Sequence, residues 1–237
     1  MKALIISDIH SNIYALEALW RQEKDSEVIY CTGDLVDYGP FPKEVLDWVR
    51  AHDVICTQGN HDRWVAACYR AGNTLPNMLA AERAWAHHNA ALLDDDDIRY
   101  LEQLPLTISF ELQLVPYGMT HLYNEYEEIV SLHAYTQFCA ETFPAITVLP
   151  LTRLIVGHTH RQAVRYLSDE TLWLNPGSAS NRRRDDPDQS SHYATITDGV
   201  ISLKRLIYDI EPLRRAVAQL ELKESEMRIG RRYFGAR

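Results

Sequence analysis

Short apolar runs, most of them followed by polar residues, alternate along much of the chain with stretches of helical periodicity. Four runs are short and rich in β-branched residues, which is typical of buried strands: Ala3–Ile6, Val28–Tyr30, Val54–Ile55 and Leu154–Val156. Asn12–Glu23 and Pro42–His52 have apolar residues at helical spacing, and Ser11 precedes the first of them as a good N-cap. This alternation predicts a layered α/β protein with helices flanking a sheet.

The middle and the end of the chain have different patterns. Residues 63–105 are helical in character and predict a helical cap, in which Asp94–Asp97 forms a solvated, helix-capping acidic start. Three later segments read as strands: Thr171–Leu174, Tyr193–Thr197 and Val200–Tyr208. Asp198-Gly199 is a strong hairpin turn between the last two. Residues 212–237 predict one amphipathic helix followed by a basic tail.

Composition fits a single domain spanning all 237 residues, because 46% of them are apolar and no Ser/Gly/Pro-rich linker divides the chain. The apolar runs are far shorter than the roughly 20 residues that cross a bilayer, and Ala3–Ile6 is too short for the core of a signal peptide. We therefore expect a cytoplasmic protein without a membrane span. The four cysteines lack CxxC spacing, which predicts free, buried thiols.

The net charge of −9 argues against a protein whose main partner is nucleic acid, since Lys and Arg supply most of that affinity. It does not argue against a small phosphate ester. Local basic patches and bound metal ions make a cleft positive even in an acidic protein.

Candidate chemistry lies in five polar signatures that follow apolar runs. They are Asp8-Ile9-His10, Gly33-Asp34 with Asp37, Gly59-Asn60-His61-Asp62, His121, and Gly157-His158-Thr159-His160. Ligands in open α/β sheets gather beyond the carboxyl ends of the strands. Carboxylate, imidazole and amide donors suit divalent ions such as Mn²⁺, Fe²⁺, Zn²⁺, Co²⁺ or Ni²⁺. Two such ions, roughly 3.5–4 Å apart, need a bridging carboxylate, for which Asp34 is the natural candidate, and share a hydroxide that attacks phosphorus.

In this order, the motifs DxH, GDxxD, GNHD, a single His and GHTH resemble the calcineurin-like metallophosphoesterase superfamily, and in particular its small bacterial and archaeal phosphodiesterase branch. The resemblance runs through residues 1–208. It implies a four-layered α/β/β/α sandwich with a dinuclear metal site at one end of the sheets. The strands expected from the apolar pattern agree with that architecture.

The resemblance also implies roles for individual residues. The first ion would be held by Asp8, His10, Asp34 and His160, and the second by Asp34, Asn60, His121 and His158. His61 would lie beside the leaving group as a general acid or a positive stabiliser, and Asp62 would orient it. Asp37 is expected to hold its loop rather than a metal ion.

Two assignments differ from the family pattern or leave alternatives open. Many relatives have Gly after the single histidine, whereas Leu122 follows His121 here, so His133 is a conceivable substitute, although we favour His121. Asn175-Pro176-Gly177-Ser178 resembles a family segment near the site and leads to Arg182, Arg183 and Arg184. An arginine fork suits phosphate recognition, but this mixed-charge loop is equally compatible with a solvated surface.

The expected function is hydrolysis of a small phosphodiester or phosphomonoester, such as a nucleotide, with two divalent ions, manganese first among them. Alternatives within the family are a diadenosine polyphosphate hydrolase and a protein phosphatase. A scaffold that has lost catalysis is less favoured, because the chain keeps His61 and a complete ligand set. The C-terminal helix leaves open whether it packs on its own core or on a second copy of the chain.

Overall fold

The computed structural model describes residues 1–71, 79–124, 127–143, 151–181, 183, 185 and 190–234. Its strands are β1 (Lys2–Ile6), β2 (Val28–Cys31), β3 (Ile55–Cys56), β4 (Thr107–Leu112), β5 (Val115–Thr120), β6 (Arg153–Ile155), β7 (Ala163–Tyr166), β8 (Leu172–Asn175), β9 (Ser191–Thr197) and β10 (Val200–Leu206). Within these residues they form two five-stranded sheets. The first has the order β10-β9-β1-β2-β3 and the second the order β4-β5-β6-β8-β7.

Both sheets are mixed. In the first sheet, β1, β2 and β3 run parallel, and the β9–β10 hairpin adds antiparallel to β1. In the second sheet, β5, β6 and β8 run parallel, with β4 and β7 antiparallel at the two edges. The predicted hairpin turn is confirmed: Asp198 and Gly199 have φ of 49° and 81°, which are values that suit a two-residue hairpin loop.

The hairpin of β4 and β5 and the edge strand β7 were not among the expected strands. The turn between β4 and β5 is Gln113-Leu114, with φ of 52° and 66°. Neither residue type signals such a turn, because turn positions with positive φ are normally occupied by Gly or Asn. Pro116 and Gly118 also interrupt the β-branched pattern of β5.

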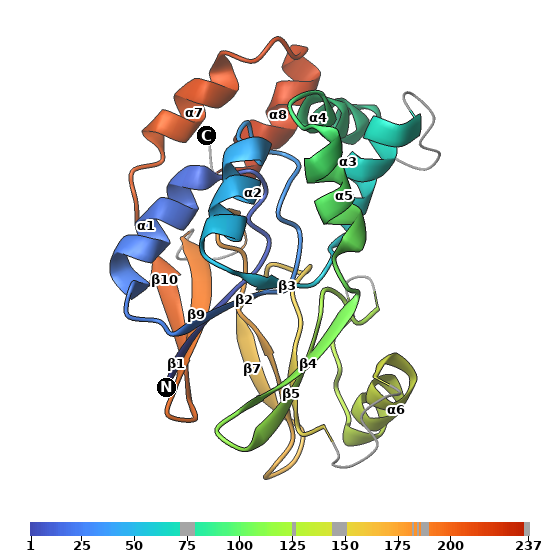
Figure 1. The fold of residues 1–237 in the computed structure, drawn as a ribbon, viewed down its shortest axis with the longest axis vertical. Helices are drawn as coiled ribbons and strands as arrows, with labels where there is room; N and C mark the ends of the chain where they lie inside the picture. The colour runs from blue at the N-terminus through green and yellow to red at the C-terminus, as the bar shows by residue number, and fades with distance from the viewer. Residues whose placement is uncertain are drawn as a thin grey trace.

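The helices are α1 (Ile13–Glu23), α2 (Pro42–Ala51), α3 (Asn60–Ala71), α4 (Ala80–Ala91), α5 (Asp95–Gln103), α6 (Leu132–Thr142), α7 (Glu211–Ala218) and α8 (Glu224–Tyr233). Figure 1 shows α6 at the lower right, apart from the other helices. The predicted helical character of residues 63–105 is confirmed over its described part by α3, α4 and α5, although α3 already begins at Asn60.

Alternation along β1 explains the layers. Leu4 and Ile6 pack in a core with α1, α2, α3 and α5, whereas Ala3 and Ile5 pack on the opposite face against residues of the second sheet such as Met119. A further core joins the second sheet to α6. The order is therefore helix, sheet, sheet, helix, which confirms the expected four-layered α/β/β/α architecture.

The predicted helix starts need two corrections. Asn12, not Ser11, caps α1, because its side chain accepts from Ala15 N at 3.2 Å, while Ser11 Oγ donates to Asn89 Oδ1 at 2.6 Å. Asp94 does cap α5, but the acidic cluster is not wholly solvated. Asp97 is completely buried, and Arg50 Nη1 lies 2.7 Å from it. Its carboxylate is thus compensated by a cation from α2.

The expected single C-terminal helix is wrong, since the chain forms α7 and α8. A straight helix over residues 212–233 would extend about 33 Å and would not fold back on itself. Instead, Leu213 and Val217 of α7 and Phe234 after α8 share a core with Trp85. Arg231 and Arg232 belong to α8 rather than to a tail, and residues 235–237 lie outside the described part.

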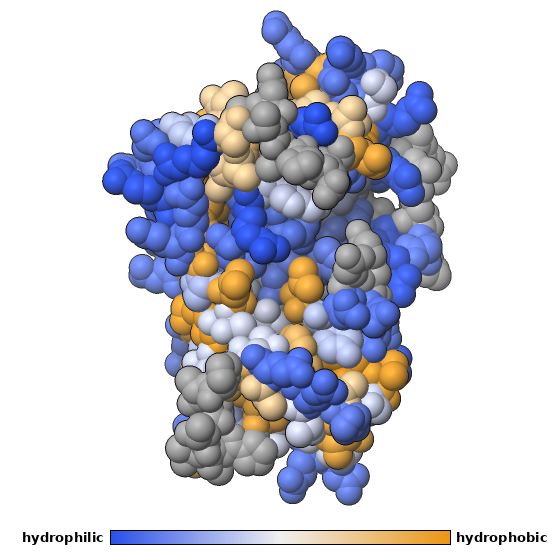
Figure 2. Space-filling model, turned by 90° about the vertical axis from the view of Figure 1, so that its right-hand side faces the viewer, coloured by the Kyte–Doolittle hydropathy of each residue, from blue (hydrophilic) through white to orange (hydrophobic). Residues whose placement is uncertain are grey.

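Figure 2 shows apolar groups scattered among hydrophilic side chains on the face it presents, as is usual for protein surfaces. Across the described part of the chain, every helix is too short or too polar to span a bilayer. The four cysteines are free thiols, as expected, with Cys139 half-buried and the others buried.

Candidate metal centre

All five polar signatures meet where strands of the two sheets end. Asp8 and His10 follow β1, Asp34 follows β2, and Asn60 and His61 begin α3 just beyond β3. From the second sheet, His121 follows β5, and His158 and His160 follow β6. The parallel strands of each sheet deliver these side chains to a common edge.

Asp8, His10 and His160 form the first of two clusters with metal-ligand geometry. His160 Nε2 lies 3.0 Å from Asp8 Oδ1, and His10 Nε2 lies 4.0 Å from the same oxygen. Asp8 is held by its other oxygen, which accepts from Ser7 Oγ and, at 3.2 Å, from His158 N. One carboxylate oxygen is therefore fixed by the protein and the other faces two imidazoles.

Asp34, His121 and His158 form the second cluster. His121 Nε2 lies 2.9 Å from Asn60 Oδ1 and 3.1 Å from Asp34 Oδ2. His158 Nδ1 lies 3.0 Å from the same Asn60 oxygen. Ligand atoms about 2.1 Å from an ion are about 3 Å apart at octahedral angles, so these spacings are those of a shared coordination sphere.

Asp34 connects the two clusters. Its Oδ2 is 3.1 Å from His121 Nε2 and 3.8 Å from His10 Nε2. Its Oδ1 accepts from His61 N at 2.9 Å, which ties the carboxylate to the first turn of α3. A Cβ on Gly59 would overlap this oxygen, so only glycine permits the approach. Asp34 thus lies where the sequence analysis expected the bridge.

Buried polar atoms in this region fit divalent cations. Both ring nitrogens of fully buried His10 lack a hydrogen-bond partner among the described residues. His121 Nδ1 lies 2.7 Å from the carbonyl oxygen of Thr32 and donates to it in the neutral ring, so the Nε2 lone pair faces the oxygens of Asn60 and Asp34. Several acceptors that converge without a donor repel one another unless a cation lies between them.

The electrostatics agree with this geometry. Burial, assisted by His61, holds the pKa of His10 well below its ordinary value, so its ring is neutral. Burial and the nearby His121 lower the pKa of His158 to about 4. Burial alone would lower the pKa of His121, but Asp34 raises it to about 9. The site thus has two uncharged imidazoles, those of His10 and His158, and around Asp34 a negative potential that favours positive charge at His121, from a proton or from a metal ion in its place.

Asp62 does not orient His61, contrary to the expectation from the motif. Its carboxylate accepts from the backbone amides of Gly59, Asp34 and Leu35 at 2.8, 3.0 and 2.8 Å. The partner of His61 is Asp37, whose Oδ2 lies 2.7 Å from His61 Nδ1. Asp37 lies in the bridge motif and Asp62 directly follows His61 in the sequence, and only the fold reveals which carboxylate faces the imidazole.

Asp37 also holds its loop, as predicted, because its Oδ1 accepts from Tyr38 N at 2.8 Å. Although burial alone lowers the pKa of His61, Asp34 and Asp37 raise it above its ordinary value. His133 lies exposed on α6 and belongs to neither of the clusters found among the described residues. The structure therefore brings His121, not His133, to the site.

The Asn175-Pro176-Gly177-Ser178 segment ties two signatures together. Asn175 Nδ2 donates to Gly157 O at 2.7 Å and to Thr159 Oγ1 at 3.1 Å. Ser178 Oγ donates to Asp8 O at 2.7 Å. The segment thus fixes the loops that carry the first cluster. It supports the site through the backbone rather than by facing a ligand.

Of the three candidate arginines, the structure describes Arg183, whereas Arg182 and Arg184 lie outside the described residues. Arg183 lines the cleft in front of the clusters. Its guanidinium donates to Thr159 O at 2.7 Å and pairs with Asp185. It is near the candidate site, but its guanidinium already has partners.

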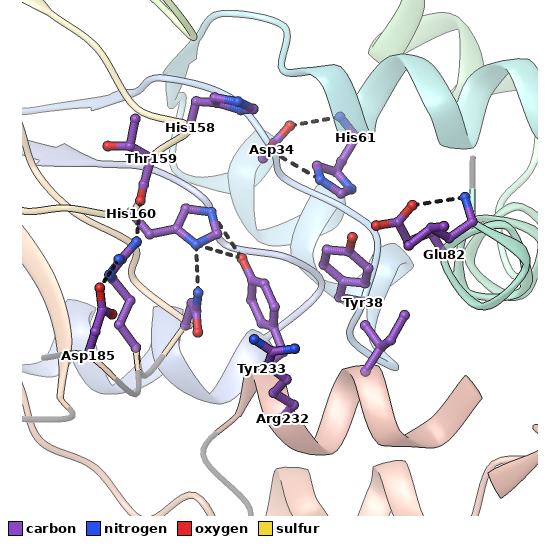
Figure 3. Close-up of a pocket in the computed structure, with 14 residues that line it drawn as sticks. Asp34, Tyr38, His61, Glu82, His158, Thr159, His160, Asp185, Arg232 and Tyr233 are labelled. Atoms are coloured by element: carbon purple, nitrogen blue, oxygen red, sulfur yellow. Dashed lines mark hydrogen bonds and ion pairs between the residues drawn. The ribbon is translucent and has the colours of Figure 1, made fainter. Parts of the chain in front are cut away.

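A cleft of about 650 Å³ lies in front of the clusters (Figure 3). Asp34, His61, His158 and His160 face it, together with Leu79 and Glu82 at the start of α4 and Ile229, Arg232 and Tyr233 of α8. The sequence analysis did not identify these α4 and α8 residues. No local motif marks them, since they are brought to the site by tertiary packing.

Comparisons with known proteins agree with this geometry. The profile of the calcineurin-like phosphoesterase superfamily domain matches residues 1–199. The crystal structure of a metallophosphoesterase from Sphaerobacter thermophilus is similar with a TM-score of 0.72 and 26% identity, covering 97% of this chain and 98% of that one. An uncharacterized protein of Methanocaldococcus jannaschii is 25% identical, covering 93% of each chain.

A third similarity is shorter. The symmetrical bis(5'-nucleosyl)-tetraphosphatase of Pectobacterium carotovorum is 29% identical over 115 residues, which cover 42% of this chain and 41% of that protein. The family profile spans all five signatures, and the fold matches over nearly the full length. The chain therefore belongs to the calcineurin-like phosphoesterase superfamily.

Proposed function

We propose that the protein is a dinuclear metal-dependent phosphoesterase that hydrolyses a small phosphodiester or phosphomonoester. The observation that carries the proposal is the pair of His/Asp clusters joined through Asp34 at the floor of a cleft. The buried carboxylates of Asp8 and Asp34 need compensating positive charge, and the imidazoles around them offer lone pairs to a cation. Membership of the phosphoesterase superfamily points to a phosphate ester as the substrate.

Seven residues would hold the two ions. Asp8, His10, Asp34 and His160 are proposed for the first, and Asp34, Asn60, His121 and His158 for the second. When bound, two such ions supply a nucleophile at neutral pH and neutralise the charge that develops on the phosphoryl group. We propose manganese, because oxygen-rich and imidazole-containing sites without thiolates suit it.

His61 is the proposed general acid. Asp37 accepts from its Nδ1, which leaves Nε2 to face the cleft, where His61 is among the lining residues. Asp34 and Asp37 raise the pKa of His61, which favours a protonated ring that can donate to the leaving-group oxygen. Asp62 is proposed to act only by holding the backbone of the bridge loop, through the amides it binds.

A second candidate substrate is a diadenosine polyphosphate. It is favoured by the similarity of 115 residues to the symmetrical bis(5'-nucleosyl)-tetraphosphatase. That similarity covers less than half of either chain, so the general phosphoesterase activity remains the primary proposal.

The test is hydrolysis by chelator-stripped protein after Mn²⁺, Ni²⁺, Co²⁺, Zn²⁺ or Mg²⁺ is added back separately. Bis-p-nitrophenyl phosphate, p-nitrophenyl phosphate and diadenosine tetraphosphate serve as the three substrates. We expect metal-restored cleavage of at least one ester, with Mn²⁺ the most effective. His61→Asn should lower turnover about 100-fold or more with unchanged metal content. Inactivity with every ion and every substrate would contradict the proposal.

A further inference from the structure

The helix α8 forms part of the cleft although it lies outside the family profile, which ends at residue 199. Tyr233, the last residue of α8, has its hydroxyl 3.1 Å from Nε2 and 3.2 Å from Nδ1 of His160. Figure 3 shows this ring directed toward His160 from the helix below it. Its centroid also lies 4.8 Å from that of His10. A residue remote in sequence thus reaches two proposed ligands of the first ion.

Specific packing positions α8. Trp85 of α4 is fully buried and donates from Nε1 to Glu226 O at 2.8 Å. A Cβ on Gly230 would lie 2.5 Å from Trp85 Cζ2, so the helix backbone rests directly on the indole. Phe234, 1% exposed, anchors the end of the helix in the same core. The position of Tyr233 therefore follows from a close-packed interface.

The Tyr233 hydroxyl is not needed to satisfy His160. Asn181 Nδ2 lies 2.7 Å from His160 Nδ1, and Asp8 Oδ1 lies 3.0 Å from Nε2. A hydroxyl almost equally distant from two nitrogens of one imidazole cannot be aligned with both, because the lone pair of one and the N–H of the other point in different directions. Nδ1 thus has a shorter contact with Asn181 than with the phenol, and Nε2, beside Asp8 Oδ1, is the nitrogen that the proposed ion would take.

Ser178, which also lies near Tyr233, already has its hydrogen bonds. Ser178 Oγ donates to Asp8 O at 2.7 Å and accepts from the amides of Ser180 and Asn181 at 3.1 and 2.7 Å. A serine hydroxyl has one donor and two acceptor sites, and all three are used. If an ion takes His160 Nε2, as the proposed function requires, the proton of the Tyr233 hydroxyl is available to a group in the cleft.

We propose that Tyr233 is a substrate-binding residue whose hydroxyl donates a hydrogen bond to a phosphoryl oxygen of a small phosphate ester. The inference rests on the proposed function, because the ester must lie over the two clusters. A neutral donor beside the metal ligands binds a phosphate oxygen without competing with the cations for the Asp and His side chains. Residues of α8 line the cleft together with Leu79 and Glu82 at the start of the adjacent α4.

The test compares wild-type protein with Tyr233→Phe, which keeps the aromatic packing and removes only the hydroxyl. For the Mn²⁺-loaded proteins, we expect kcat/KM for the better of the two p-nitrophenyl esters to fall at least tenfold. The dissociation constant of inorganic phosphate, measured by titration calorimetry, should rise about tenfold. The affinity for Mn²⁺ should change less than twofold.

Tyr166→Phe is the matched control, since Tyr166 is exposed on β7 and should leave all three quantities unchanged. Gly230→Ala provides a second variant that displaces α8 from Trp85 without altering a cleft residue, and it should also weaken phosphate binding. Unchanged phosphate affinity in Tyr233→Phe would overturn the inference. An equal loss of Mn²⁺ affinity would do so too, because the hydroxyl would then serve His160. If wild-type protein binds phosphate but hydrolyses no ester, the proposed function fails while the binding comparison still decides the role of Tyr233.

Discussion

Five of the proposed ligands have backbone conformations that L-residues rarely adopt. They are Asp8, His10, Asp34, His158 and His160, with φ between 48° and 64°. Left-handed conformations cost a non-glycine residue on the order of 1–2 kcal/mol. The surrounding loops hold them in place: the amides of Ile9 and His10, for example, both donate to Asp34 O, at 2.8 and 3.0 Å. Strain of this kind concentrates at functional sites, which agrees with the proposed role.

Replacing Asp37 by Asn tests the assignment of the partner of His61. Loss of the carboxylate lowers the pKa of His61, because Asp37 is one of the groups that raise it. A general acid is lost as the pH rises through its pKa, so the alkaline decline of kcat should begin at lower pH in Asp37→Asn. We also expect kcat at neutral pH to fall about tenfold or more. A pH–rate profile measures both effects.

Asp169→Asn is the control for this substitution, because Asp169 is an exposed residue remote from the cleft. Metal content should match wild type in both variants. A kcat profile in Asp37→Asn that coincides with wild type at every pH would remove Asp37 from the reaction.

At the level of elements, the segment after β8 holds the loops after β1 and β6 together. Asn175 is 1% exposed, and besides its two donated hydrogen bonds its Oδ1 accepts from Gly177 N at 2.9 Å. Asn175→Ala removes these bonds and leaves Gly157 O buried without that donor. We expect a loss of about 1–3 kcal/mol in the free energy of unfolding. Mn²⁺ affinity should also fall about tenfold, because His158 and His160 lie on the released loop.

Denaturant unfolding and metal titration check the two parts of this prediction separately. Asn124→Ala is a suitable control, since Asn124 is exposed, donates to the exposed Glu127 carboxylate and is not among the residues that line the cleft. If Asn175→Ala lost stability but kept its Mn²⁺ affinity, the segment after β8 would stabilise the fold without positioning the ligands.

At the level of the whole molecule, Glu23 connects α1 to three strands of the first sheet. The residue is only 3% exposed, and Tyr193 Oη and Lys204 Nζ both donate to its Oε1 at 2.7 Å. Lys2 Nζ lies 2.6 Å from Oε2. Burial opposes ionisation, but Lys2, Lys204 and Tyr193 outweigh it and lower the pKa of Glu23.

A lowered carboxyl pKa stabilises the fold above the unfolded-state value of 4.5, and this contribution is lost as the pH falls through the folded-state pKa. Glu23→Gln should therefore be less stable than wild type at pH 7, by about 1–3 kcal/mol. The difference should shrink below about pH 4.5, as wild-type Glu23 becomes protonated. Thermal unfolding across this pH range measures it. Glu17 is exposed on the same helix, so Glu17→Gln should behave as wild type. A stability difference between Glu23→Gln and wild type that stays constant with pH would contradict the ion-pair account.

Sequence patterns predicted the parts of the molecule that depend on local signals. Buried strands and the polar residues that follow them share one short segment, so β1, β2 and β6 and their ligands were recognisable together. Contacts between segments that are distant in the sequence could not be predicted in this way. Tyr233 and His160 are 73 residues apart, and nothing near either residue encodes their approach. The choice between Asp37 and Asp62 depended on loop geometry, and the β4–β5 hairpin on a turn without glycine.

Each cluster draws its members from both sheets: Asp8 and His160 follow β1 and β6, while Asp34 and His121 follow β2 and β5. Under the proposed function, each ion would therefore act as a cross-link between the two halves of the sandwich. Its binding energy would add to the apolar core between the sheets. The association of the two sheets and the occupancy of the metal site would then depend on the same quantity, which is the concentration of metal available to the protein.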